Sequence, residues 1–301
     1  GGPDAMDRTR PRPGGLAQQI DLLRAGIDAS ADPQWERTAT ILHRFGRFAA
    51  DGCGISRLEE VTPAAARSYV DAPTSTGEPP SISTMHWRRT ALRLLFRAAR
   101  RHGLVDGDPT LDLKLPPRSS LGTRPLTDDE VTLCRSVAQW SLAGSRRAAV
   151  WALAEATCRS SELPGVAGDD IDLHSGRVWI GGGKATEPRE GRLSAWGLVQ
   201  VRERIEELEA PSRPLVYSGR APAGAGQVSG AAALVDVLAR AGLHQEPDVR
   251  PGSVAAWAGR RVFEETGRIE LAARALGVRS LDRAAGIIAW DWRTDEEPVE
   301  G

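Results

Sequence analysis

The sequence contains few cysteines and few histidines, and none of them stands at a metal-ligand spacing. Cys53, Cys134 and Cys158 are odd in number and far apart, which favours free thiols in a reducing cytoplasm. The five histidines form no helical pair. We therefore expect neither a metal site nor another cofactor.

Long apolar runs are also absent, because no stretch approaches the roughly 20 residues that cross a bilayer. No secretory signal is visible, and residues 1–14 are expected to be a tag followed by a disordered lead. The remaining length and the 41% hydrophobic content suffice for two domains of ordinary size. A cytoplasmic protein without a membrane partner is expected.

The net charge of −1 is small but unevenly distributed. Residues 1–124 carry 18 basic and 14 acidic side chains, a balance of +4, whereas residues 125–301 carry 21 and 26, a balance of −5. Five acids fall within residues 291–301, which are expected to form an acidic tail. Since nucleic-acid binders present a basic surface, the N-terminal part is favoured for that role.

Apolar periodicity and capping residues predict a mostly helical chain of two domains with a small three-stranded antiparallel sheet. Residues 15–105 are expected to form a helical domain, residues 106–124 a linker rich in proline and glycine, and residues 125–290 a second domain. Its strands are expected at Asp170–Leu173, Arg177–Ile180 and Gly191–Ser194.

One helix, predicted over Ser81–His102, is apolar on most sides and basic on one. No acid occurs between Ser81 and Gly103. A solvated face would mix charges of both signs, so we favour a stripe that follows DNA phosphates over a general polar face. The stripe consists of Arg89, Arg93, Arg97 and Arg100.

The octet Ala156–Leu163 places Arg159 where an apolar helix ends, with Glu162 three residues later. An arginine at such a junction is costly to bury unless a carboxylate or phosphate meets its planar donors. The simplest interpretation is that Arg159 and Glu162 pair with each other. The octet also resembles the first arginine box of the phage-integrase (tyrosine recombinase) family, in which the arginine grips the scissile phosphate.

The resemblance extends along most of the chain. It implies a core-binding (SAM-like) domain at residues 15–105 and a recombinase catalytic-like domain at residues 125–290, which together clamp DNA. It also implies that Lys184, at the tip of a hairpin, approaches the same phosphate. The glycines before Lys184 do not form a nucleotide-binding P-loop, because the spacing and the following Ser/Thr are missing.

The family's second box and its nucleophile have no counterpart here. Ser253 and Ala256 stand where the resemblance implies a histidine and an arginine, Val278 where it implies another histidine, and Ile287 where it implies the tyrosine. No histidine follows His244 and no tyrosine follows Tyr217. Without a nucleophile the covalent 3′-phosphotyrosine route is lost, so we predict an inactive homologue of the recombinases.

The sequence thus favours a DNA-binding pseudoenzyme, nucleoid-associated and related to mobile elements, with a structural or regulatory role on duplex DNA. We expect phosphate contacts from the basic stripe together with Arg159 and Lys184; Arg250, Arg260 and Arg261 are candidate base readers. One alternative is an active recombinase that uses a displaced nucleophile such as Tyr217. Others are self-association or binding to an active recombinase, and a separate helix-turn-helix within residues 268–290.

Overall fold

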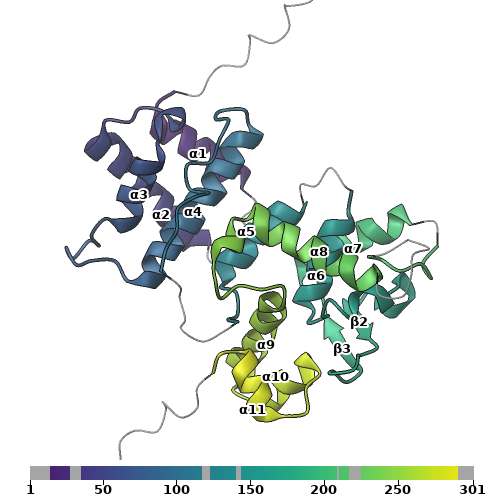
Figure 1. The fold of residues 1–301 in the computed structure, drawn as a ribbon. Coiled ribbons are helices and arrows are strands. Elements are labelled where there is room, and N and C mark those ends of the chain that lie inside the picture. Colours follow the sequence, from purple (N-terminus) through teal and green to yellow (C-terminus); the bar gives the residue numbers. More distant parts are fainter. Residues whose placement is uncertain are drawn as a thin grey trace, which may run out of the picture. The chain divides into compact units, whose positions relative to one another are not determined.

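The structure is a computed structural model that describes residues 14–27, 35–116, 123–139, 144–208, 210–216 and 225–290 (Figure 1). The chain forms two compact units, an N-terminal unit that ends at Leu115 and a C-terminal unit that begins at Pro116. Most of the described residues are helical, and one three-stranded antiparallel sheet is present among them. The predicted fold class is therefore confirmed.

The N-terminal unit is a bundle of helices around one core. The hydroxyl of Thr62 accepts the N–H of Ala65 and caps a helix that begins at Pro63, as the sequence predicts. Leucines and phenylalanines from three helices fill the core, among them Leu42, Phe45 and Phe96. The elements are α1 (Leu16–Gly26), α2 (Trp35–Arg47) with a π-helical end at Phe48–Gly52, a 3-10 turn at Leu58–Glu60, α3 (Pro63–Asp71) and α4 (Ile82–Arg101).

Tyr69 is a packing residue of the N-terminal unit. Its side chain is buried, its hydroxyl donates to the carbonyl of Ile41 at 2.7 Å, and its ring lies 5.2 Å from that of Phe45. Burial raises the pKa of the Tyr69 phenol to about 12. Its burial and its contacts with Ile41 and Phe45 assign Tyr69 to the core of the N-terminal unit.

The predicted phosphate stripe on α4 is wrong for its first two members. Arg89 and Arg93 are only 1% and 2% exposed. Arg89 donates to the carbonyl of Leu113 at 2.9 Å, and Arg93 donates to that of Thr110 at 3.3 Å. These guanidiniums are held by backbone oxygens, which the pattern of side chains does not reveal. Of the other two members, Arg97 is half-buried and Arg100 is exposed.

Because Thr110 and Leu113 contact α4, the linker between the two units is shorter than predicted. Residues 106–115 pack on the N-terminal unit, and Leu113 and Leu115 join its core. Arg67 adds a hydrogen bond of 2.8 Å to the carbonyl of Lys114. At the other end, the N–H of Arg124 donates to the carbonyl of Asp248 in the C-terminal unit at 2.9 Å. Residues 117–122 of the predicted linker lie outside the described residues.

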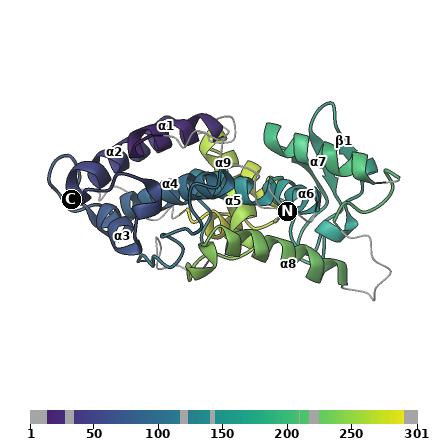
Figure 2. The same ribbon diagram turned by 90° about the horizontal axis from the view of Figure 1, so that it is seen from above.

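The C-terminal unit is built around helix α6, which is buried from Ala148 to Glu155 and contacts α5, α7, α8 and α9. Figure 2 shows α6 among the helices of this unit. Its element order, with 3-10 turns left out, is α5 (Asp128–Gln139), α6 (Arg146–Glu155), β1 (Ile171–Asp172), β2 (Arg177–Ile180), β3 (Arg189–Arg192), α7 (Ala195–Glu207), α8 (Ala225–Arg240), α9 (Gly252–Thr266), α10 (Ile269–Leu276) and α11 (Leu281–Ile287).

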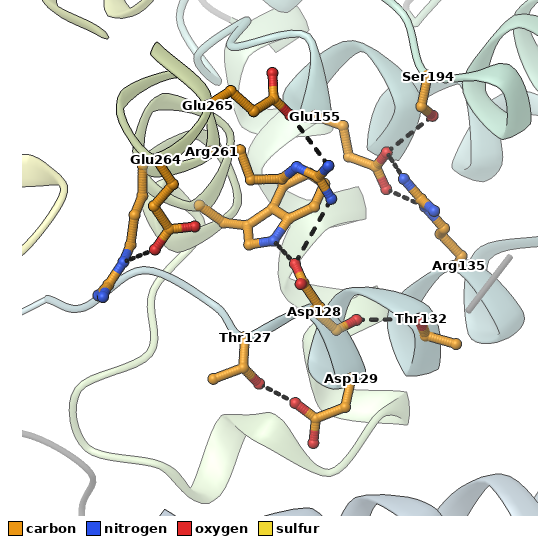
Figure 3. A network of polar contacts seen from close by, with 12 residues as sticks. Thr127, Asp128, Asp129, Thr132, Arg135, Glu155, Ser194, Arg261, Glu264 and Glu265 are labelled. Atoms are coloured by element: carbon orange, nitrogen blue, oxygen red, sulfur yellow. Dashed lines mark hydrogen bonds and ion pairs between the residues drawn. The ribbon is translucent and has the colours of Figure 1, made fainter. Parts of the chain in front are cut away.

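A buried polar network ties α6 to its neighbours (Figure 3). The carboxylate of Glu155 accepts two hydrogen bonds from Arg135, at 2.8 and 2.7 Å, and one from the indole of Trp151 at 2.8 Å. The hydroxyl of Ser194, the N-cap of α7, also donates to it at 3.2 Å. Because every oxygen of this buried carboxylate is paired, the network fixes α5, α6 and α7 together.

The sheet has the order β1-β2-β3, with Ile180 opposite Arg189. Strand β3 begins two residues before the predicted strand, so Arg189 and Gly191 face inward. A Cβ placed on Gly191 would lie 2.5 Å from the carbonyl oxygen of Ala156, which explains why only glycine fits there. The close approach brings the sheet against the octet that follows α6. Outside the sheet, Pro214 forms an isolated antiparallel bridge with Ala167, and Tyr217 lies outside the described residues.

Helices α9, α10 and α11 close the C-terminal unit around a small core that contains Ala273, Leu276 and Ala284. Gly267 and Gly277, both with positive φ, end α9 and α10. Phe263 on α9 packs against Trp290 at 4.5 Å between ring centroids. A turn joins α10 to α11 within residues 268–290, and a separate helix-turn-helix there stays an alternative prediction. Among the described residues no helix combines the length and apolar character that crossing a membrane requires.

We predict that Arg89→Ala lowers the free energy of unfolding by about 1–3 kcal/mol, because the buried carbonyl of Leu113 loses its donor. Arg100→Ala, an exposed position on the same helix, serves as the matched control and is expected to change stability by less than about 0.5 kcal/mol. Urea denaturation followed by circular dichroism measures both. Equal stability of the two variants would contradict the structural role of Arg89.

Candidate nucleic-acid interface

The octet begins in a strained turn at the end of α6. Thr157 has a φ of 75°, which β-branched residues rarely adopt. Its hydroxyl donates to the carbonyl of Ala275 at 2.6 Å, and its own carbonyl accepts from Arg189 at 2.6 Å. These two hydrogen bonds fix the conformation of the turn, and the residues after it pass the inward face of the sheet.

Glu162 pairs with Arg189 and not with the side chain of Arg159. Both terminal nitrogens of Arg189 donate to the carboxylate at 2.8 Å, and both side chains are almost fully buried. The carboxylate also accepts the hydroxyl of Thr186 and the backbone N–H of Arg159, the latter at 2.8 Å. The simplest interpretation of the octet, a side-chain pair between Arg159 and Glu162, is therefore wrong.

These hydrogen bonds decide the charge of Glu162. Burial alone raises the pKa of a carboxyl group, but the donors on Arg189, Thr186 and the backbone of Arg159 outweigh it and lower the pKa of Glu162 below its ordinary value. Glu162 is thus a fully engaged carboxylate, and it has no acceptor left for a second guanidinium.

Arg159 consequently lies half-buried with no side-chain hydrogen bond or salt bridge to any described residue. It lines a cavity of about 570 Å³ within the C-terminal unit. Burial lowers the pKa of Arg159, and the nearby guanidinium of Arg283 lowers it further. An arginine remains charged under both influences, so the cavity has a cationic wall.

Two positions that the resemblance marks as lost lie in the same cavity. Ala256 on α9 and Ile287 at the end of α11 line it together with Arg159. Ser253 and Val278 do not line it; both are buried, and the hydroxyl of Ser253 accepts the N–H of Arg250 at 3.0 Å. No histidine or tyrosine is among the described residues that line the cavity.

Cys158 also borders the cavity, but it is a poor nucleophile. Burial raises the pKa of the Cys158 thiol, and the carboxylate of Glu162 raises it further. The thiolate form is therefore scarce at neutral pH. As for metals, the described residues contain no group of three or more potential ligands of the histidine, cysteine or carboxylate type.

The hairpin that carries Lys184 reaches the octet. Its turn is closed by the N–H of Gly183, which donates to the carbonyl of Thr186 at 3.0 Å, and Thr186 binds Glu162. A Cβ on Gly183 would lie 3.9 Å from the hydroxyl of Ser161. Lys184 itself is exposed and does not line the cavity, so the structure brings its turn, but not its ammonium group, to the site.

The candidate base readers on α9 are largely paired with acids (Figure 3). Arg260 donates to Glu264 at 2.8 Å. Arg261 donates to Glu265 at 3.2 Å and lies near Asp128 and over the ring of Trp257. Arg250 is exposed and donates to the carbonyl of Val249 at 2.9 Å. DNA would have to compete with these acids for the guanidinium groups. The two arginines on α9 are therefore weaker candidates for reading bases than the sequence suggests.

Sequence reasoning missed Arg189 and Arg283. Arg189 was hidden because the strand was placed two residues too late, and strict alternation from Val178 and Ile180 across the hairpin would have put it on the inward face. Arg283 stands four residues before Ile287 on α11, and side chains at this spacing share one face of a helix. That spacing was visible in the sequence.

No protein-family model matches this chain, and no curated protein matches it. Solved structures similar to it include XerA recombinase (TM-score 0.47, 15% identity, 90% of this chain and 93% of that one). A lambda integrase dimer bound to a COC' core site is also similar (TM-score 0.43, 16% identity, 95% of this chain and 80% of that one). The Tn1549 transposon integrase in complex with a circular intermediate DNA is similar as well (TM-score 0.42, 13% identity, 91% of this chain and 95% of that one). The likeness is one of fold.

We predict that Glu162→Gln lowers stability by about 3–5 kcal/mol at neutral pH, because it leaves the buried Arg189 without its carboxylate. Glu190→Gln, on the exposed face of the same strand as Arg189, is the matched control and should be nearly neutral. Urea denaturation at pH 7 compares the two.

The same pair predicts a pH dependence. Because the folded-state pKa of Glu162 is lowered, its contribution is complete above the ordinary value of 4.5 and is lost as the pH falls through the folded-state value. The stability difference between wild type and Glu162→Gln should therefore shrink on acidification. A difference that stays constant from pH 7 to pH 3 would show that the ion pair does not cause it.

Proposed function

We propose that the protein binds duplex DNA and holds a backbone phosphate at Arg159 without cleaving the strand. The observation that carries this proposal is a half-buried guanidinium that borders a cavity and has no acceptor among the described residues. A desolvated cation of this kind is costly unless an anion meets it. The ligand is therefore expected to be anionic.

Phosphate suits this guanidinium better than a carboxylate of the protein. The one acid nearest in sequence, Glu162, is already bound by Arg189 through both of its oxygens. The planar fork of an arginine matches a phosphate through two parallel hydrogen bonds. The octet's resemblance to an arginine box that grips DNA phosphate points to the same ligand, and Lys184 on the adjoining hairpin would add a second contact.

The absence of cleavage is proposed on chemical grounds. Strand transfer needs a nucleophile and several donors for the charged transition state, and each missing donor commonly costs about 10²–10³ in rate. Here Ala256 and Ile287 border the cavity where the resemblance implies an arginine and a tyrosine. A protein of this kind would act as a structural or regulatory factor, alone, as a self-associated form or beside an active recombinase.

Two alternatives make different predictions. An active recombinase with Tyr217 as nucleophile would form a covalent adduct with a nicked suicide duplex, visible after denaturing electrophoresis. An interaction protein that relies on its acidic tail would bind random duplex weakly or not at all. Our proposal expects salt-sensitive duplex binding without an adduct.

We predict that Arg159→Ala weakens binding to a random-sequence duplex by about 10-fold or more and reduces the slope of log affinity against log salt by about one, because one phosphate contact is lost. Fluorescence anisotropy across a range of salt concentrations measures both. The matched control is Arg240→Ala, whose exposed guanidinium is paired with Asp236. Equal affinities of the two variants would refute the assignment of Arg159.

A further inference from the structure

A second arginine borders the cavity from α11. The guanidinium of Arg283 makes no hydrogen bond or salt bridge with the described residues, whereas its backbone N–H is capped by Ser280 at 3.1 Å. Two other arginines of this three-helix group are paired with acids, at 2.8 Å for Arg260 with Glu264 and at 2.6 Å for Arg268 with Glu270, whereas Arg274 on α10 is exposed and does not line the cavity.

The local sequence explains why Arg283 lacks a partner. Four residues after it, on the same face of α11, stands the apolar Ile287, and four residues before it stands Arg279. Arg279 takes the nearby carboxylate of Glu187 at 2.6 Å. No hydrogen bond or ion pair joins the side chain of Arg283 to an acid of the described chain, and Glu162 is likewise bound by Arg189 and not by the side chain of Arg159.

The two unpaired guanidiniums are close enough to influence each other. Burial lowers the pKa of Arg159 most, and Arg283 is the next cause. Two like charges at the rim of one cavity repel, so the arrangement is stabilised when an anion lies between them. The first turn of α9, at Pro251 and Gly252, also borders the cavity and adds the positive end of a 15-residue helix.

Much of the remaining lining is apolar. Leu234, Ala255, Ala256, Leu276 and Ile287 contribute apolar walls, and Thr123 and Ser160 add two hydroxyl groups. Its volume of about 570 Å³ lies in the range of roughly 300–1,000 Å³ that small organic ligands occupy, and it exceeds the needs of a bare inorganic phosphate. The charged rim and apolar walls together suit a phosphate that carries organic substituents.

We propose that Arg159 and Arg283 form one phosphodiester-binding site, in which the two guanidiniums hold the phosphate and the apolar walls receive the groups esterified to it. In duplex DNA this ligand would be a backbone phosphodiester with its sugars, and in that form the inference rests on the proposed function. The chemistry also fits a small free diester. Separate measurements on the full chain distinguish these two sources.

The first measurement uses diphenyl phosphate, a small diester with apolar substituents, at constant ionic strength. It is expected to raise the melting temperature of the wild-type protein, because a ligand of the native state stabilises that state, and to do so more than inorganic phosphate at the same concentration. Arg283→Ala and Arg159→Ala should each abolish most of the shift, while the exposed, salt-bridged Arg268→Ala should retain it. No shift in the wild type, or an undiminished shift in Arg283→Ala, would overturn the proposed site.

The second measurement uses duplex DNA and fluorescence anisotropy. Arg283→Ala should lower affinity by about 10-fold and reduce the salt slope by about one relative to Arg268→Ala. Because both arginines would hold one phosphate, the double variant Arg159→Ala/Arg283→Ala should lose less than the product of the single losses. A loss confined to Arg159→Ala would overturn the role of Arg283 and leave the proposed duplex binding intact.

The two measurements also separate the inference from the proposed function. If the wild type binds the diester through both arginines but does not bind duplex DNA, the site is a small-molecule site and the proposed function fails. If the wild type binds duplex DNA and neither arginine contributes, the site assignment fails while DNA binding itself stands.

Discussion

The buried ion pair between Glu162 and Arg189 is the constraint from which the character of the C-terminal unit follows. It joins the turn after α6 to strand β3, and Arg189 extends the contact to the carbonyl of Thr157. A buried pair of this kind is often no more stabilising than apolar residues would be, because both ions lose their hydration. Its specific effect here is to consume the acid that would otherwise neutralise Arg159.

As a consequence, the three arginines of this region have different environments. Arg189 is structural, since both its neighbours and its burial commit it to Glu162. Arg159 and Arg283 border a cavity without such partners. Of the three, only Arg189 has a carboxylate opposite it, which offsets part of the cost of removing its charge from solvent. An arginine is therefore left without a counter-charge where the neighbouring acids are already paired with other arginines.

The helix predicted over Ser81–His102 agrees with α4 to within one residue at each end, because the signals of a helix are local. Thr62 followed by proline, or the apolar run of α6, needs no knowledge of distant residues. The exposed or buried state of arginines was predicted poorly, since it depends on distant backbone oxygens. Arg89 and Arg93 look like a phosphate-binding stripe until the carbonyls of Thr110 and Leu113 are placed against them. Residues 106–115 were taken for linker for the same reason.

At the site, the sequence indicated which residues gather but not how they are paired. The resemblance to the recombinase family implied that Ala256 and Ile287 lie near Arg159. In the structure all three residues line the same cavity. The choice between Arg159 and Arg189 as partner of Glu162 lay beyond local reasoning, because the two arginines are 30 residues apart in the chain and meet only through the sheet register. A correct boundary for β3 would have revealed the competitor.

The net charge of the chain has little influence on the electrostatic potential at such a site, because the effect of an exposed charge falls off with distance. The C-terminal half carries a balance of −5, yet acids such as Glu264, Glu265 and Glu270 are paired with arginines on their own helices. Beyond about 8–10 Å, physiological salt screens exposed charges, whereas a half-buried guanidinium is screened less. The potential at the cavity is thus governed chiefly by the half-buried Arg159, with the exposed Arg283 beside it, and not by the sum over the surface. If the proposed function holds, binding of a polyanion by this near-neutral protein depends on a few well-placed contacts, and its affinity rises or falls with each of them.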